Sequence, residues 1–120
     1  MTETLDFARE CGPNVGIVLD SWHWHHSGGS AKEILTAGAG SILHVHAADA
    51  PEMAPEAVDD MERLLPGSGI VDFSSFFSAL RDAGYQGAVS PEVFSGRMYE
   101  ITPEQGAREG AVCTGRVMNC

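Results

Sequence analysis

The chain has 120 residues, and 43% of them are hydrophobic, which is enough for one domain with an apolar core. The 17 acidic and 7 basic side chains give a formal net charge of −10, so the chain repels the phosphate backbone of nucleic acids. No apolar run approaches the roughly 20 residues that span a bilayer, and residues 1–12 lack the pattern of a signal peptide. These features exclude nucleic acids and membranes as partners, and we expect a cytoplasmic protein.

The first third of the chain alternates helical and strand patterns. Residues 2–11 carry apolar side chains three and four positions apart, which predicts a helix. The apolar, β-branched run 15–19 is typical of a strand that is covered on both faces, and it ends at Asp20. We expect residues 21–29 to form a polar loop. Residues 30–38 predict a second helix, with a serine as N-cap and a glycine as its end.

A second strand and a long insertion follow. Residues 42–46 repeat the apolar strand pattern and run into a polar cluster. Residues 50–69 form the insertion, in which we expect a helical stretch around residues 56–64. The Pro-Gly-Ser-Gly sequence at 66–69 cannot continue a helix and predicts a turn.

The last part of the chain predicts two further helices around a third strand. Residues 72–84 place four apolar side chains at helical spacing, between an aspartate N-cap and a glycine stop. Residues 88–90 form a short strand that leads to Glu92, and a final helix begins near residues 103–104. The order αβαβαβα predicts an α/β fold with a parallel sheet, either doubly wound or part of a barrel. A complete eight-stranded barrel needs about 250 residues, so three strands would be a fragment.

Asp20, His46 and Glu92 each come directly after one of the three predicted strands. Ligand sites of parallel α/β folds gather at the carboxyl ends of the strands, so we expect these side chains to converge. Each one alone could be a structural hydrogen-bonding group. Together, two carboxylates and an imidazole suit a divalent ion such as Mn²⁺, Mg²⁺, Co²⁺ or Zn²⁺. His23 follows Asp20 by three residues and could point toward the same site at the carboxyl ends of the strands.

Four ordered segments carry a resemblance to a known family. They are LDSWH at 19–23, LHVHAAD at 43–49, RLLPGSG at 63–69 and AVSPE at 88–92. They resemble the sugar phosphate isomerase/epimerase group of xylose-isomerase-like TIM barrels, in that family's order and spacing. The resemblance implies a parallel-strand (β/α) TIM-barrel fragment, about strands six to eight with flanking helices. Residues 1–120 would then be a single partial (β/α)8-barrel domain, the C-terminal half.

The resemblance also implies a site. In the family, Glu, Asp, His and Glu at the ends of strands five to eight hold the metal, so Asp20, His46 and Glu92 would be the last three metal ligands. The first Glu has no counterpart in these 120 residues. His23 matches a histidine that binds a substrate hydroxyl, and Arg63 matches an arginine that also contacts the substrate.

The implied activity is that of a divalent-metal-dependent isomerase or epimerase of carbohydrate metabolism. Its substrate would be a small carbohydrate, a sugar or a sugar phosphate. The metal would polarise the carbonyl group while Glu92, as the catalytic carboxylate, moves a proton on the neighbouring carbon. The partner carboxylate on the opposite sugar face is the absent Glu, for which Asp49 or Glu52 are possible replacements. We therefore expect this chain alone to lack a two-base epimerisation site.

Several alternatives stay open on the sequence alone. The chain could be a non-catalytic truncated remnant, or a dehydratase that uses much the same ligands. A metal-binding module would use the histidines instead, at positions 23, 25, 26, 44 and 46. A DNA-repair endonuclease of the same fold would need a basic face that the net charge of −10 does not offer. Open strand edges at both sides of the sheet also predict self-association.

Overall fold

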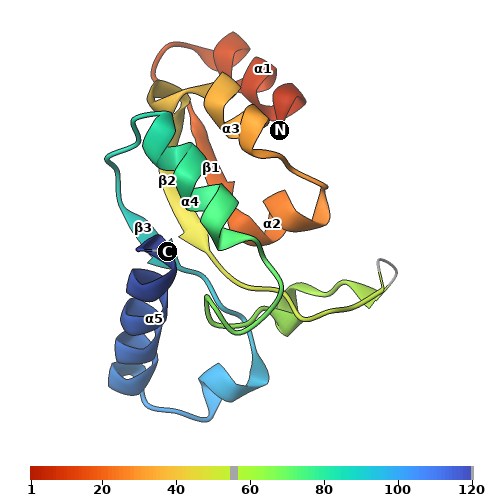
Figure 1. The fold of residues 1–120 in the computed structure, drawn as a ribbon, viewed down its shortest axis with the longest axis vertical. Helices are drawn as coiled ribbons and strands as arrows, with labels where there is room; N and C mark the ends of the chain where they lie inside the picture. Colours follow the sequence, from red (N-terminus) through yellow and green to blue (C-terminus); the bar gives the residue numbers. More distant parts are fainter. Residues whose placement is uncertain (55–56, 120) are drawn as a thin grey trace.

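The sheet of this protein has three parallel strands. A computed structural model describes residues 1–54 and 57–119, and in them the strands are β1 (Ile17–Asp20), β2 (Ile42–Ala47) and β3 (Val89–Pro91). Their order in the sheet is β1-β2-β3, and both pairs are parallel (Figure 1). The predicted α/β class with parallel strands is therefore confirmed.

The four longer helices lie close to where the sequence predicts them. They are α1 (Thr2–Cys11), α3 (Ala31–Ala37), α4 (Phe73–Asp82) and α5 (Pro103–Met118). Polar side chains begin three of them: Ser30 and Thr102 form capping boxes at α3 and α5, and Asp72 accepts a hydrogen bond from the Ser75 N–H at α4. These side chains satisfy N–H groups that a helix leaves without partners in its first turn.

The prediction of a polar loop over residues 21–29 is wrong for its first part, because Ser21–His26 form a short helix, α2. Asp20 is the N-cap of α2, and its Oδ1 accepts hydrogen bonds from the backbone N–H of Trp22 at 2.8 Å and of His23 at 3.4 Å. The strand thus passes directly into a helix. The sequence pattern missed α2 because the two tryptophans and three histidines give no simple apolar periodicity.

The insertion after β2 has little helix. Residue 56 of the helical stretch expected at 56–64 lies outside the described residues, and the rest of that stretch holds the 3₁₀ turn η3 (Asp60–Glu62). Leu64 pairs with Asp49 in an antiparallel bridge, with N–H···O distances of 2.9 and 2.8 Å in the two directions. This pairing draws the chain into an extended form. Further 3₁₀ turns are η1 (Ala39–Ser41) and η4 (Gly96–Tyr99).

The core lies between the sheet and the helices. α3 and α4 pack against each other beside the sheet, α1 contacts α3 and β1, and α5 packs on β3 and α4 (Figure 1). Leu19 of β1 and Val45 of β2 are buried in this core, as is Phe76 of α4. Val18 of β1 is 55% exposed, because it points to the other face of the sheet. No helix among the described residues has the length and apolar character to cross a membrane.

The final helix, α5, is longer than its glycines suggest. It runs for 16 residues, although it includes Gly106, Gly110 and Gly115. Gly110 has a packing role, since a Cβ atom at this position would lie 2.8 Å from Cγ of Pro91 in β3. The glycine therefore lets α5 approach the sheet closely.

Candidate metal centre

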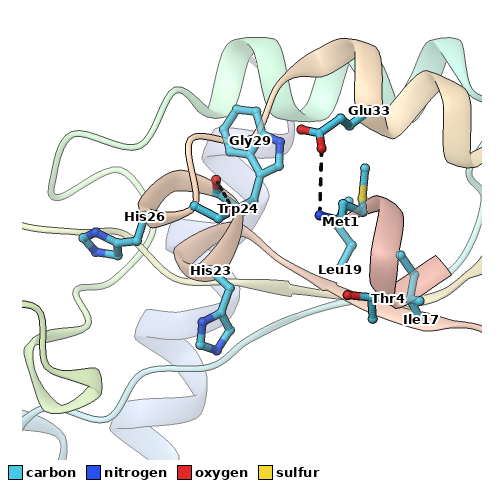
Figure 2. A pocket seen from close by; sticks show the side chains of 10 residues that line it. Met1, Thr4, Ile17, Leu19, His23, Trp24, His26, Gly29 and Glu33 are labelled. Carbon is cyan, nitrogen blue, oxygen red and sulfur yellow. Dashed lines mark hydrogen bonds and ion pairs between the residues drawn. The ribbon is translucent and has the colours of Figure 1, made fainter. Parts of the chain in front are cut away.

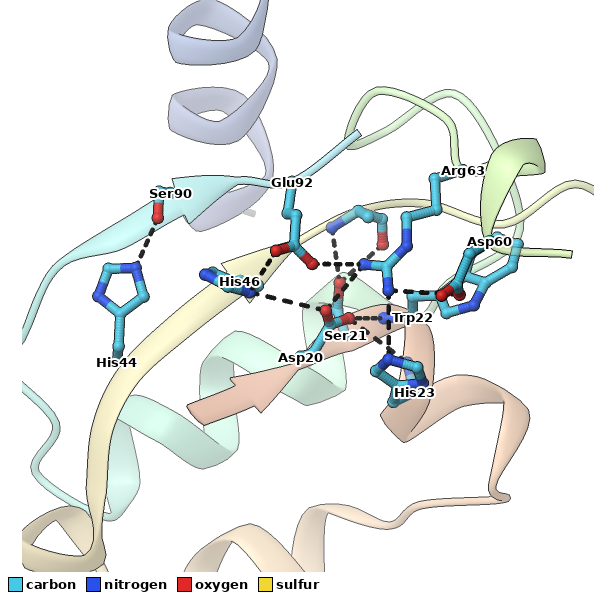
Figure 3. Close-up of polar contacts among 11 residues, drawn as sticks. Asp20, Ser21, Trp22, His23, His44, His46, Asp60, Arg63, Ser90 and Glu92 are labelled. Atoms are coloured by element: carbon cyan, nitrogen blue, oxygen red, sulfur yellow. Dashed lines mark hydrogen bonds and ion pairs between the residues drawn. The ribbon is translucent and has the colours of Figure 1, made fainter. Parts of the chain in front are cut away.

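The register of the sheet brings the three expected ligands together. Asp20 of β1 stands opposite His46 of β2, which stands opposite Ser90 of β3, and Glu92 follows directly after β3. His46 Nδ1 lies 3.2 Å from Glu92 Oε1 and 3.8 Å from Asp20 Oδ2 (Figure 3). One ligand atom from each residue lies within 4.8 Å of the other two. Among the described residues, this is the one group of three or more His, Cys, Asp or Glu side chains with such a geometry.

The donor set fits a divalent ion. Donors bound at about 2.1 Å around a tetrahedral ion lie about 3.4 Å from one another, and the two distances at His46 are close to that value. Two carboxylate oxygens and an imidazole nitrogen suit Zn²⁺, Mn²⁺ or Co²⁺. Asp20, His46 and Glu92 could therefore hold such an ion with small movements of their side chains, leaving further coordination positions for other ligands.

Asp20 is the most buried of the three ligands. Burial alone would raise the pKa of its carboxyl, but the hydrogen bond and the positive charge of Arg63 outweigh that effect. The hydrogen bond from the backbone N–H of Trp22 adds to the lowering, so the pKa of Asp20 lies below the ordinary value of an aspartate. Asp20 is thus a carboxylate at neutral pH, as metal binding requires.

Arg63 reaches the centre from the insertion. Its Nη1 donates to Asp20 Oδ2 at 2.8 Å and to Glu92 Oε2 at 3.0 Å, while its Nη2 lies 3.2 Å from His23 Nε2 (Figure 3). The arginine side chain is 2% exposed, whereas His23 is exposed. Arg63 therefore contacts two of the ligands directly, whereas the ring of His23 meets the centre through Arg63 and is open to solvent.

Asp49 holds the segment that carries Arg63. Its carboxylate is 1% exposed, and its two oxygens accept four backbone hydrogen bonds at 2.8 to 2.9 Å. The donors are the N–H groups of Ala50, Gly67, Gly69 and Val71. The main chain of Asp49 also pairs with Leu64, the neighbour of Arg63. Asp49 therefore orders the loop and is not among the ligand atoms, although the sequence suggested it as a replacement carboxylate.

Two aromatic rings complete the surroundings of Arg63. The guanidinium carbon lies 5.6 Å from the ring centre of Trp22 and 5.3 Å from that of Phe94. Sequence reasoning missed this role of both rings, as well as that of Asp60, whose Oδ1 lies 3.4 Å from Arg63 Nη2. No local spacing signals the two ring contacts, because Trp22 and Phe94 are far from Arg63 in the sequence. Asp60 is only three residues before Arg63, so this i,i+3 spacing was the one local signal available.

A separate cavity of about 440 Å³ lies between α1, β1, α2 and α3. It is lined mainly by apolar side chains such as Leu19 and Trp24, and the amino group of Met1 faces Glu33 across it at 3.8 Å (Figure 2). Of the site residues only His23 borders it. This cavity is therefore distinct from the mouth that the three ligands form.

Comparisons with known proteins place this geometry in a family context. The chain is 31% identical over 106 residues to an inosose isomerase of Bacillus subtilis, and the aligned region covers 88% of this chain and 38% of the relative. It is 33% identical over 100 residues to an L-ribulose 3-epimerase of Methylomonas sp., and this aligned region covers 82% of this chain and 31% of the relative. The crystal structure of the IOLI protein with a bound zinc atom superposes with a TM-score of 0.91 at 28% identity, over 98% of this chain and 43% of that one.

The chain thus spans less than half of the length of these relatives: 38% of the inosose isomerase, 31% of the epimerase and 43% of the zinc-bound structure. Its three-stranded open sheet matches a portion of a TIM barrel. The family model described as xylose isomerase-like TIM barrel matches residues 1–114. On these grounds, the chain belongs to the xylose isomerase-like TIM barrel family.

Proposed function

We propose that this chain carries the metal-binding part of an isomerase or epimerase that moves a proton next to the carbonyl of a sugar or sugar phosphate. The observation that carries the proposal is the convergence of Asp20, His46 and Glu92 at the ends of three parallel strands. The similarity to an inosose isomerase and an L-ribulose 3-epimerase supports the reaction class. In this proposal residues 1–120 act as one partial barrel domain, and the cytoplasm is the expected location.

Each residue of the centre has a distinct task. Asp20, His46 and Glu92 would hold the divalent ion, which supplies polarisation of the substrate carbonyl when bound. Glu92 is 29% exposed and is the less buried of the two carboxylates, so it is the group that takes up or returns the proton. His23 lies exposed at the same mouth and donates a hydrogen bond to a substrate hydroxyl. A direct contact between Arg63 and the substrate stays a prediction from the sequence, and the 2% exposure of this side chain favours an indirect role.

Metal binding is the first test. We expect the purified chain to bind Zn²⁺ or Co²⁺ weakly in an isothermal titration, and the binding to be lost in His46→Ala and in Glu92→Gln. His25→Ala is the matched control, because His25 lies outside the ligand group. Equal losses in His46→Ala and His25→Ala, with binding kept in Glu92→Gln, would favour a module that uses the histidines. Full binding in His46→Ala would exclude the proposed site.

Proton exchange tests the chemistry. A single carboxylate can exchange the proton next to a carbonyl, whereas inversion of the carbon needs a second acid or base. With Mn²⁺ in deuterated water, we expect the chain to introduce deuterium into a ketose or an inosose slowly, without forming the epimer. Glu92→Gln should abolish the exchange.

The other outcomes of the exchange experiment separate the alternatives. A product that has lost water would identify a dehydratase. If the wild-type chain gives no more exchange than free Mn²⁺, the chain is a non-catalytic remnant and the proposed reaction fails. Formation of the epimer in this chain would show that another group supplies the second base.

A further inference from the structure

We propose that Arg63 is a positioning residue, which orients both carboxylates of the centre and selects the Nδ1–H tautomer of His23. The metal-related half of this inference rests on the proposed function. The half that concerns His23 needs no metal, so the two can fail separately.

Arg63 connects the two carboxylates through one nitrogen. Nη1 donates to Asp20 Oδ2 at 2.8 Å and to Glu92 Oε2 at 3.0 Å. With Oε2 held by the guanidinium, the other oxygen of Glu92 faces His46 Nδ1 at 3.2 Å. Without the arginine, two negative carboxylates would stand close together and repel each other. Arg63 therefore fixes which oxygen of Glu92 is presented to an ion.

The second nitrogen of the fork determines the proton position on His23. Nη2 of Arg63 lies 3.2 Å from His23 Nε2. Arginine has five N–H donors and no acceptor, so Nε2 of His23 must accept the hydrogen bond. A neutral imidazole whose Nε2 accepts carries its proton on Nδ1. His23 is thus set to offer an Nδ1–H donor to a substrate oxygen.

The surroundings of Arg63 leave it little opportunity to touch a substrate. Its side chain is 2% exposed and lies between the rings of Trp22 and Phe94. Both Nη atoms already have two partners each, the fourth being Asp60 at 3.4 Å from Nη2. Nε is buried and has no partner among the described residues. Arg63 therefore acts through the groups that it holds.

The first experiment measures Co²⁺ binding by the visible absorption of the bound ion. Arg63→Ala should raise the Kd for Co²⁺ by about 10- to 100-fold and change the shape of the spectrum, because loss of a group that orients metal ligands has an effect of that size. Arg9→Ala is the control, since it removes an arginine whose side chain is 60% exposed. Guanidinium ion at millimolar concentration should restore binding and spectrum in Arg63→Ala, because it can occupy the space between the two rings.

Arg63→Lys separates charge from geometry. A lysine keeps the positive charge but lacks the planar fork that bridges two carboxylates, so we expect its spectrum to resemble that of Arg63→Ala. Unchanged or tighter Co²⁺ binding in Arg63→Ala would overturn the proposal, because it would mean that the arginine only repels the ion. Failure of guanidinium to rescue a folded Arg63→Ala would also count against it.

The second experiment records the ring ¹⁵N resonances of the metal-free chain at neutral pH, with His23 assigned from the spectrum of His23→Gln. We expect the Nδ1–H tautomer of His23 in the wild-type chain, and a change towards Nε2–H in Arg63→Ala. An Nε2–H or doubly protonated His23 in the wild-type chain would refute the inference, and this result needs no folded variant. If the tautomer is as expected but Co²⁺ does not bind, the proposed function fails and the effect of Arg63 on His23 stands.

Discussion

Replacing Asp49 by asparagine should destabilise the protein strongly, because it removes two hydrogen bonds to a buried carboxylate. Each carboxylate oxygen of Asp49 accepts two backbone N–H groups. An asparagine can keep one such pair with its carbonyl oxygen, but its NH₂ group would then face the other two donors. A hydrogen bond to a charged group contributes about 1.5 to 3 kcal/mol, so we expect a loss of about 3 to 6 kcal/mol in the free energy of unfolding.

Urea denaturation followed by tryptophan fluorescence measures this loss. Asp82→Asn is the matched control, because Asp82 is exposed in the last turn of α4 and its replacement should change the stability by less than about 0.5 kcal/mol. Complete unfolding of Asp49→Asn without urea would also agree with the expectation, since domains have only about 5 to 15 kcal/mol of stability. A loss below about 1 kcal/mol would refute the role assigned to the four hydrogen bonds.

Three further predictions concern α5, α4 and the sheet edges. Gly110→Ala should destabilise the protein in thermal unfolding, because its Cβ would lie 2.8 Å from Pro91 Cγ, whereas Gly115→Ala meets no atom within 4 Å and should stabilise α5 by up to about 1 kcal/mol. Equal effects of the two changes would contradict the close approach of α5 to β3. Hydrogen bonds from Ser75 lower the pKa of Asp72 below its ordinary value of 3.8. The Asp72 cap therefore stabilises the protein fully above pH 3.8, and this stabilisation is lost as the pH falls through the lowered pKa of the folded state. Asp72→Ala should therefore cost about 1 kcal/mol at pH 7 in urea denaturation and progressively less in acid, and a difference that does not shrink in acid would disprove the capping role. β1 and β3 each have an unpaired side in the described sheet, so light scattering at increasing concentration should show association, and a constant monomer mass up to high concentration would speak against it.

The sequence predicted the elements that local chemistry determines. Caps such as Ser30 and Asp72, and the helical spacing of the phenylalanines at 73, 76 and 77, depend on residues within one or two turns of each other. The strands were found because short apolar runs between glycines and polar residues are typical of buried parallel strands. The rule that parallel strands end on one side then sufficed to bring Asp20, His46 and Glu92 together.

What the sequence did not predict depends on contacts between distant segments. Asp20 is both a candidate metal ligand and the N-cap of α2. The sequence pattern predicted only the first role, because it indicated a loop after Asp20. The path of the insertion depends on the Asp49 carboxylate, which accepts hydrogen bonds from four backbone N–H groups. These groups are 1, 18, 20 and 22 residues after Asp49 in the sequence, so no periodic pattern could predict the contacts. A helix over residues 56–64 was expected from local propensity, but the bridge between Asp49 and Leu64 overrides that propensity.

The supports of the centre come from within the three βα units themselves. Asp20 is held by the N–H groups of α2, and Glu92 is held by Arg63, whose segment is in turn tied to Asp49. Each of these contacts joins residues of the same 120-residue chain. The candidate site has only three protein ligands, so an ion bound there would have coordination positions left open. The chain's own contacts therefore orient Asp20 and Glu92. If the chain binds an ion as proposed, comparing its Kd with that of a full-length relative would measure how much the missing fourth ligand adds to the affinity.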